Sequence, residues 1–190
     1  MTTVYLKPHK EESLLRFHPW VFSGAIRSIQ LDADYPHAQP QEGEIVQVLD
    51  SNGKILGVGH YQIGSIAVRI LAFGVEELPL NFWQERIRAA YEVRCSLGLI
   101  TAETENYNNT YRLVHGEGDF LPGLIVDIYA DTAVIQAHSI GMHYHRKEIA
   151  EAIIHSVHQV DKVYYKSDDT LPHKAHIEGE RVGYLIGAEK

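Results

Sequence analysis

Residues 44–73, EIVQVLDSNGKILGVGHYQIGSIAVRILAF, decide the fold of the first part of the chain. Three runs rich in β-branched and other apolar residues predict three strands. The runs are Glu44–Leu49, Ile55–Tyr61 and Ile66–Phe73. Between the first two, the pair Asn52-Gly53 supplies the positive φ that a tight hairpin requires. Short strands joined by tight turns are typical of a small β-barrel, which we expect to occupy residues 1–74.

The residues before this run combine a short strand, a helix and positive charge. Val4–Leu6 predicts a strand, and Pro8 suits the first turn of a helix that Pro19 stops. The first thirty residues hold four Lys or Arg and two Glu, a net charge of +2. Since the whole chain carries −8, the remainder carries −10. This asymmetry indicates that one face meets an anion.

The second part of the chain, residues 78–187, predicts an α+β domain. Gly74–Pro79 is the expected boundary, and Asn81 with Gln84 has the spacing of a helix capping box. The expected elements are a helix from 81 to Gly98, strands at 111–115, 124–129 and 132–139, a helix from His143 to His158, and strands at 162–166 and 181–186.

Composition excludes several classes of protein. Of the 190 residues, 45% are hydrophobic and 22% are charged, which is ordinary for a globular protein. No run approaches the roughly 20 apolar residues of a membrane span, and residues 1–12 contain no apolar signal region. One cysteine, Cys95, fits a reducing compartment, so we expect a cytoplasmic protein without membrane contact. The negative net charge disfavours indiscriminate coating of nucleic acid.

The usual chemical motifs are weak. Neither Gly57-Val58-Gly59 nor Gly116-Glu117-Gly118 is followed by the helix that a nucleotide phosphate needs, so we expect no cofactor site. Cys95 has a cation beside it but no recognisable general base, and a buried structural role is the expected one. The histidines at 138, 143, 145, 155 and 158 leave a metalloprotein as a distant alternative, and no metal site is expected.

Two longer stretches resemble a known family. They are SLLRFHPWVFSGAI at 13–26, preceded by Leu6-Lys7-Pro8, and YRLVHGEGDFLPGLIVDIYAD at 111–131. A weaker match is Lys166-Ser167-Asp168 followed by Glu178-Gly179. Together these stretches resemble the N-terminal part of S-adenosylmethionine-dependent methyltransferases related to those that make 5-methylcytosine in large-subunit ribosomal RNA. The family commonly has glycine where His9 and Phe120 stand, asparagine in place of His115, and arginine in place of Lys166.

The resemblance implies an RNA-binding PUA domain at 1–74, a central α+β domain at 78–187, and a Rossmann-like catalytic domain that we expect to be absent from this chain. S-adenosylmethionine would then be bound by that domain, and the chain alone would be inactive. The partners that the resemblance implies are structured ribosomal RNA and the catalytic domain. We also expect a homodimer through an exposed strand containing Val182, Tyr184, Leu185 and Ile186.

Candidate RNA contacts lie in the basic N-terminal segment. They are Lys7, Lys10, Arg16, His18, Trp20 and Arg27. The cations can neutralise phosphates, and the aromatic rings can stack on unpaired bases. For Trp20 and Phe22, however, we expect packing as core anchors rather than stacking.

A second group of candidates would line a cleft shared with the catalytic domain. Its members are Arg112, Glu117, Asp119, Lys166 and Asp168. The competing interpretation is structural, since residues 116–123 have the glycines of a tight turn. The sequence therefore predicts the RNA-recognition portion of a methyltransferase, and the resemblance implies that the enzyme acts on C5 of a 23S rRNA cytosine. The alternative is a stand-alone RNA-binding adaptor without catalysis.

Overall fold

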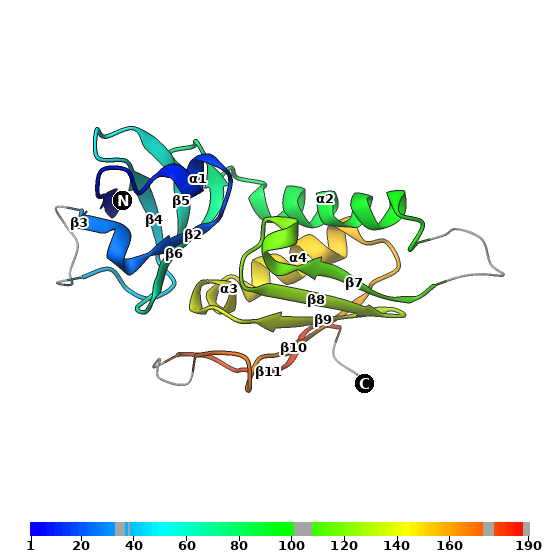
Figure 1. Cartoon of the computed structure of the whole chain (residues 1–190). Helices are drawn as coiled ribbons and strands as arrows, with labels where there is room; N and C mark the ends of the chain where they lie inside the picture. Colours follow the sequence, from blue (N-terminus) through cyan, green and yellow to red (C-terminus); the bar gives the residue numbers. More distant parts are fainter. Residues whose placement is uncertain (33–36, 38, 101–107, 173–176, 188–190) are drawn as a thin grey trace. The chain divides into compact units, whose positions relative to one another are not determined.

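The computed structural model describes residues 1–32, 37, 39–100, 108–172 and 177–187, which form two compact units, 1–80 and 81–190 (Figure 1). The loops expected around 31–42 and 103–110 lie partly outside the described residues. In the described part of the chain, no helix is long and apolar enough to cross a membrane.

The first unit is a curled six-stranded sheet with one short helix. Its elements are β1 (Thr3–Leu6), α1 (Glu12–Leu15), β2 (Trp20–Phe22), η1 (Ser23–Ala25), β3 (Ile26–Gln30), β4 (Ile45–Leu49), β5 (Ile55–Tyr61) and β6 (Ile66–Phe73). The strand order is β2-β6-β5-β4-β1-β3, with β1 and β4 parallel and the other neighbours antiparallel. The three strands expected from the quoted run are confirmed almost to the residue.

The β4–β5 hairpin is fixed by Asp50 as well as by glycine. Gly53 has a φ of 86°, as the Asn-Gly pair predicts. One carboxylate oxygen of Asp50 accepts the backbone N–H groups of Asn52 (2.8 Å) and Lys54 (2.9 Å). Asp50 is nearly buried, so this local capping satisfies donors that the tight turn would otherwise leave unpaired.

Two glycines let β5 and β6 approach too closely for any other residue. A Cβ at Gly59 would lie 2.1 Å from the carbonyl oxygen of Arg69, and one at Gly57 would lie 2.3 Å from that of Ala72. The pairing register shifts between Val58 and Gly59. Glycine and irregular pairing are the devices by which a sheet bends, so this contact curls the sheet around its core.

The core of the first unit is made of aliphatic side chains from most of its elements. The fully buried set is Val4, Leu6, Leu14, Val21, Val46, Val48, Leu56, Val68 and Ile70. The expected helix beginning near Pro8 is wrong, because α1 is a single turn. His9 and Phe17 have φ values of 62° and 61°, and this left-handed backbone cannot continue an α-helix on either side.

The second unit is a five-stranded sheet with its helices on one side (Figure 1). Its elements are α2 (Phe82–Ser96), β7 (Thr110–His115), η2 (Gly116–Asp119), β8 (Leu124–Tyr129), β9 (Thr132–Ala137), α3 (Ile140–Tyr144), α4 (Arg146–Ser156), β10 (Lys162–Lys166) and β11 (Val182–Ile186). The order is β11-β10-β9-β8-β7, antiparallel except for β9 and β10. The parallel pair needs a crossover connection, which α3 and α4 provide.

Two helix starts differ from the expectation. Asn81 precedes α2 but its side chain makes no capping hydrogen bond, so the expected capping box is wrong. The helix expected from His143 begins at Ile140, because the Ser139 hydroxyl accepts the backbone N–H of Met142 (3.4 Å). The segment is then divided at His145 into α3 and α4. Of the four residues expected to be exposed in the C-terminal strand, Val182 (41%) and Tyr184 (37%) are exposed, whereas Leu185 and Ile186 are half-buried.

We expect Gly59→Ala to lower the free energy of unfolding by about 2–3 kcal/mol, because the added methyl group must push β6 away. Gly118→Ala is the matched control, since a Cβ at Gly118 meets nothing within 4 Å. Urea denaturation followed by circular dichroism measures both. Equal stability of the two variants would contradict the close approach of β5 and β6.

Candidate functional site

Strand β2 presents a row of aromatic side chains to the outside of the first unit. Its three residues alternate, so Val21 enters the core with 1% exposure while Phe22 remains 50% exposed. The rings of His18 and Trp20 lie 5.3 Å apart and those of Trp20 and Phe22 lie 6.2 Å apart, each pair nearly perpendicular. The expectation of a core anchor is therefore wrong for Phe22, while Trp20 is half-buried. The two-residue period of a strand decided which side chain is buried, rather than side-chain size.

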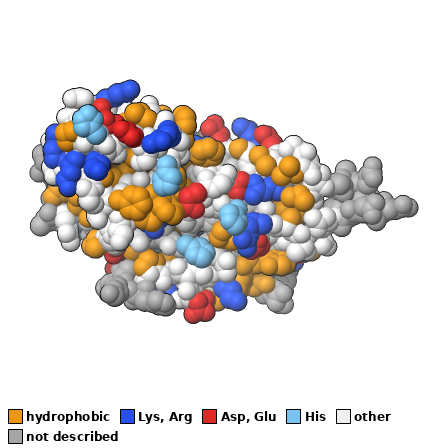
Figure 2. Space-filling model, in the orientation of Figure 1, with side chains coloured by type: hydrophobic (Ala, Val, Ile, Leu, Met, Phe, Trp, Pro, Cys, Tyr) orange, Lys and Arg blue, Asp and Glu red, His pale blue; other side chains and the backbone are white. Residues whose placement is uncertain are grey.

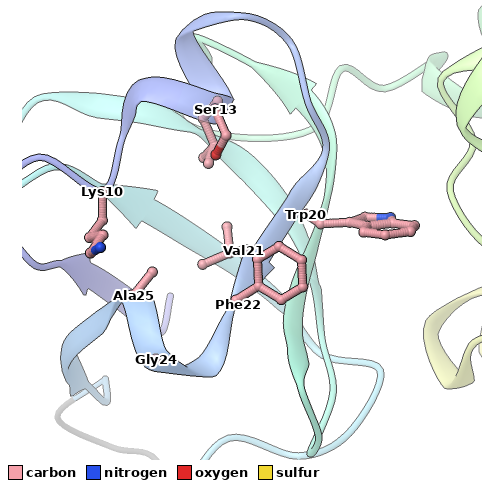
Figure 3. Close-up of a pocket in the computed structure, with 8 residues that line it drawn as sticks. Lys10, Ser13, Trp20, Val21, Phe22, Gly24 and Ala25 are labelled. Carbon is pink, nitrogen blue, oxygen red and sulfur yellow. The ribbon is translucent and has the colours of Figure 1, made fainter.

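A pocket of about 370 Å³ lies beside this row. It is lined by Lys10, Ser13, Leu14, Trp20, Val21, Phe22, Gly24 and Ala25. Figure 3 shows Lys10 and Phe22 on opposite sides, with Val21 between them. The pocket thus combines a cation at one side, an exposed ring at the other and a buried aliphatic residue between them.

The other predicted cations, Lys7, Arg16 and Arg27, do not line this pocket. Lys7 donates a hydrogen bond through Nζ to the carbonyl oxygen of Gly24 (2.8 Å), which fixes the pocket wall. Arg16 faces Glu12 across an ion pair of 3.7 Å whose two side chains are more than 70% exposed. A pair so exposed contributes little to stability, so Arg16 remains available to an anion.

Arg27 and Lys10 differ in how firmly they are held. The guanidinium of Arg27 lies 5.5 Å from the ring centre of Tyr5 and donates a hydrogen bond to the carbonyl oxygen of Ser51 (3.4 Å). Lys10 is exposed, and its ammonium group makes no ion pair with any described residue. On the face shown in Figure 2, basic and hydrophobic side chains lie next to each other over the first unit.

In the second unit, Asp119 has a structural role. Two guanidinium nitrogens of Arg94 donate hydrogen bonds to the Asp119 carboxylate, one of them at 2.8 Å. The two side chains are only 11% and 8% exposed. The same carboxylate accepts the backbone N–H of His115 (2.6 Å). These contacts tie η2 to α2. The tight turn expected at 116–123 is present, with Gly116 and Gly123 at φ values of 52° and 85°.

The remaining cleft candidates are spread over the sheet. Arg112 makes two hydrogen bonds to Asp127 (2.9 and 3.1 Å), which raise the pKa of its guanidinium, and its carbonyl oxygen accepts from Arg94 (3.0 Å). Glu117 is exposed in η2. Lys166 and Asp168 are exposed at the end of β10, a strand separated from β7 by β8 and β9. The structure thus joins Arg112 and Asp119 through Arg94 and places Lys166 and Asp168 apart from them. Glu117 lies in η2 with Asp119, and its charge and that of Arg112 act in opposite directions on the pKa of His138, which burial lowers.

The alternative chemistries find little support in the geometry. His143 is buried, with Nδ1 2.7 Å from the Tyr165 hydroxyl and Nε2 2.8 Å from the Glu178 carbonyl oxygen, and burial lowers its pKa. Among the described residues, no three His, Cys, Asp or Glu side chains gather in a metal-binding arrangement. Cys95 is exposed on α2, so its expected burial is wrong.

The two Gly-x-Gly pairs do not fit a nucleotide cofactor. At Gly57 and Gly59 the space that a phosphate would need is filled by the backbone of β6. The pair at Gly116 and Gly118 forms η2 and leads to β8, not to a helix N-terminus.

Arg94 and Phe120 are the residues that sequence reasoning missed. The Arg94–Asp119 pair joins positions 25 apart in the chain, and no local pattern links them. Phe120 offered one signal, an aromatic residue inside a glycine-rich turn, and the structure gives it a φ of 57°.

Comparison with protein families and curated relatives gives a consistent match. Residues 4–73 match the family of PUA-like domains. Ribosomal RNA large subunit methyltransferase I of Tolumonas auensis is 35% identical over 188 residues, covering 98% of this chain and 44% of the relative. The protein of the same name from Aeromonas hydrophila is 34% identical, covering 97% and 44%. This chain thus spans less than half the length of the curated relatives it matches.

Solved structures show the same fold at lower sequence identity. A Streptococcus mutans protein assigned as a SAM-dependent methyltransferase covers all of this chain and 44% of its own, with a TM-score of 0.72 and 16% identity. A structure described as a methyltransferase complexed with SAH gives the same values. At this identity the likeness shows the fold alone.

We expect Asp119→Ala to lower the free energy of unfolding by about 3 kcal/mol or more, because it leaves Arg94 nearly buried without its counter-charge. Glu92→Ala is the control, since the Arg88–Glu92 pair is 60% and 69% exposed and should contribute less than about 0.5 kcal/mol. Denaturant titration of both variants measures the difference. A loss at Asp119 no larger than at Glu92 would contradict the structural role.

Proposed function

Because the chain is a relative of the N-terminal part of ribosomal RNA large subunit methyltransferase I, with a PUA-like domain at residues 4–73, we propose that it is the RNA-recognition portion of such an enzyme. In this proposal residues 1–74 bind RNA, and residues 78–187 form a central domain that adjoins the catalytic one. The substrate is large-subunit ribosomal RNA, and the modified atom is C5 of a cytosine. S-adenosylmethionine supplies the methyl group in the catalytic domain.

The observation that carries the proposal is the exposed aromatic row beside the Lys10 pocket. Contiguous exposed apolar surface marks interaction sites, and stacking on unpaired bases is a common use of aromatic rings in RNA-binding proteins. Phe22 is half exposed on a strand that is already formed, so its ring is in position before RNA binds and no segment has to fold on binding. Lys10 lies on the other side of the pocket from Phe22, where its ammonium group can meet the phosphate of a base that enters.

Charge limits how strongly this surface binds. The chain carries −8 overall, and the basic residues near β2 are few. Each phosphate contact adds about 0.7–0.9 to the slope of log affinity against log salt concentration, so three or four contacts give weak, salt-sensitive binding. Selectivity then comes from the shape of the RNA and from stacking.

We expect Phe22→Ala to weaken binding of a large-subunit rRNA transcript about fivefold to tenfold with little change in stability, because its ring is half exposed. Lys10→Ala should weaken binding and lower the salt slope by about 0.7–0.9. Lys147→Ala, an exposed charge-matched change on α4, is the control. Fluorescence anisotropy at several salt concentrations measures all three. Equal loss in the control would show that the contact is charge in general and not this surface.

We expect no binding of S-adenosylmethionine to the 190-residue chain, because neither glycine pair forms a phosphate or ribose cradle. Isothermal titration calorimetry with the cofactor measures this directly. Micromolar binding to the chain would contradict the proposed division of labour between RNA recognition and catalysis.

A further inference from the structure

Phe120 combines an unfavourable backbone with an exposed aromatic side chain. Its φ of 57° and ψ of 29° lie in the left-handed region, where a side chain is strained and glycine is not. The residue is 45% exposed. Packing in the core therefore does not explain why a large ring stands at a position where glycine fits best.

The turn around Phe120 holds it firmly in this conformation. The next residue, Leu121, is fully buried and donates its backbone N–H to the carbonyl oxygen of Gly116 (3.0 Å). Phe120 itself donates its N–H to Glu117 (3.2 Å), and Asp119 is clamped by Arg94. Strained residues fixed by their surroundings concentrate at ligand-binding positions.

A cation supports the ring. The guanidinium of Arg86 on α2 lies 5.3 Å from the ring centre of Phe120 and 5.5 Å from that of Phe82. Phe82 is 4% exposed, so the buried end of this arrangement is anchored in the core. Burial also lowers the pKa of Arg86. The arrangement Phe82–Arg86–Phe120 holds the outer ring on a rigid base.

We propose that Phe120, supported by Arg86, is a stacking platform for one unpaired base of the bound RNA, separate from the aromatic row of β2. The inference rests on the proposed function and extends it to the second unit. A planar ring backed by a guanidinium matches the way proteins hold splayed bases, with the π-face of the base as the next layer.

The surroundings of Phe120 favour a base over a protein surface. In η2 and the turn after it, residues 116–123, Phe120 is the one large hydrophobic side chain that is exposed, and the next exposed one along the chain is Tyr129 at the end of β8. A single ring is far smaller than the contiguous area of a specific protein interface. Glu117 is exposed in the same turn and Glu85 acts on Arg86, so the contact is to the base and not to a phosphate.

Phe120→Gly tests this inference in the 190-residue chain. We expect roughly tenfold weaker binding of a large-subunit rRNA transcript, the effect of losing one stacked base. The salt slope should stay unchanged, because no phosphate contact is lost. The thermal midpoint should not fall, since glycine removes the strain. Phe120→Trp should retain binding. Unchanged affinity of Phe120→Gly, or a loss that is matched by a lower salt slope, would overturn the stacking contact.

Photocross-linking of the unaltered chain keeps the test independent of folding. The probe is the same transcript with 5-iodouridine in place of uridine, and the cross-linked peptides are located by mass spectrometry. Adducts at Phe120 support the inference. Adducts at Trp20 or Phe22 without any at Phe120 overturn it while leaving the proposed function in place. If the transcript neither binds nor cross-links, the proposed function itself fails.

Discussion

The close approach of β5 and β6 at Gly57 and Gly59 is the constraint on which the first unit depends. Two backbones in contact, with no room for a Cβ, bend the sheet and bring its residues around one aliphatic core. Strand β2 is hydrogen-bonded to β6 alone in the sheet order, so the position of Trp20 and Phe22 follows from that bend. The candidate RNA surface is therefore a consequence of backbone packing two strands away.

In both units a buried aliphatic neighbour keeps an aromatic ring at the surface. Val21 is buried between Trp20 and Phe22, and Leu121 is buried next to Phe120. Each buried aliphatic side chain fixes the local backbone, so the neighbouring exposed ring is held in place at little cost in conformational entropy. Rings that are ordered before binding lose less entropy when a base stacks on them. Both sites thus have a buried aliphatic residue next to an exposed aromatic one, although one site is a strand and the other a strained turn.

Electrostatics has a different role in each unit. Around β2, Lys10 and Arg16 are exposed and only Arg16 has a weak, solvated ion pair among the described residues, so both can meet phosphates. In the second unit, two of the five charged cleft candidates are held in ion pairs within the fold. Arg94 and Asp119 neutralise each other in a nearly buried pair, and Arg112 is held by Asp127. Stacking, more than charge, is what the second unit can offer to RNA.

The sequence alone determined the strands, the hairpin and the α+β class, because these follow from local patterns: apolar runs of strand length, an Asn-Gly pair, and stretches such as residues 13–26 that resemble one family. It also placed the basic residues at one end of the chain. Only the tertiary structure decided which side chains face outward. Phe22 is exposed because Val21 takes the inward position, and α1 shrinks to one turn because His9 and Phe17 adopt left-handed backbone. Asp119 has a structural role because it pairs with Arg94, 25 positions away, and Phe120 became a candidate binding residue because of its φ value. Long-range pairing and backbone strain depend on the packed molecule, and no local pattern encodes them.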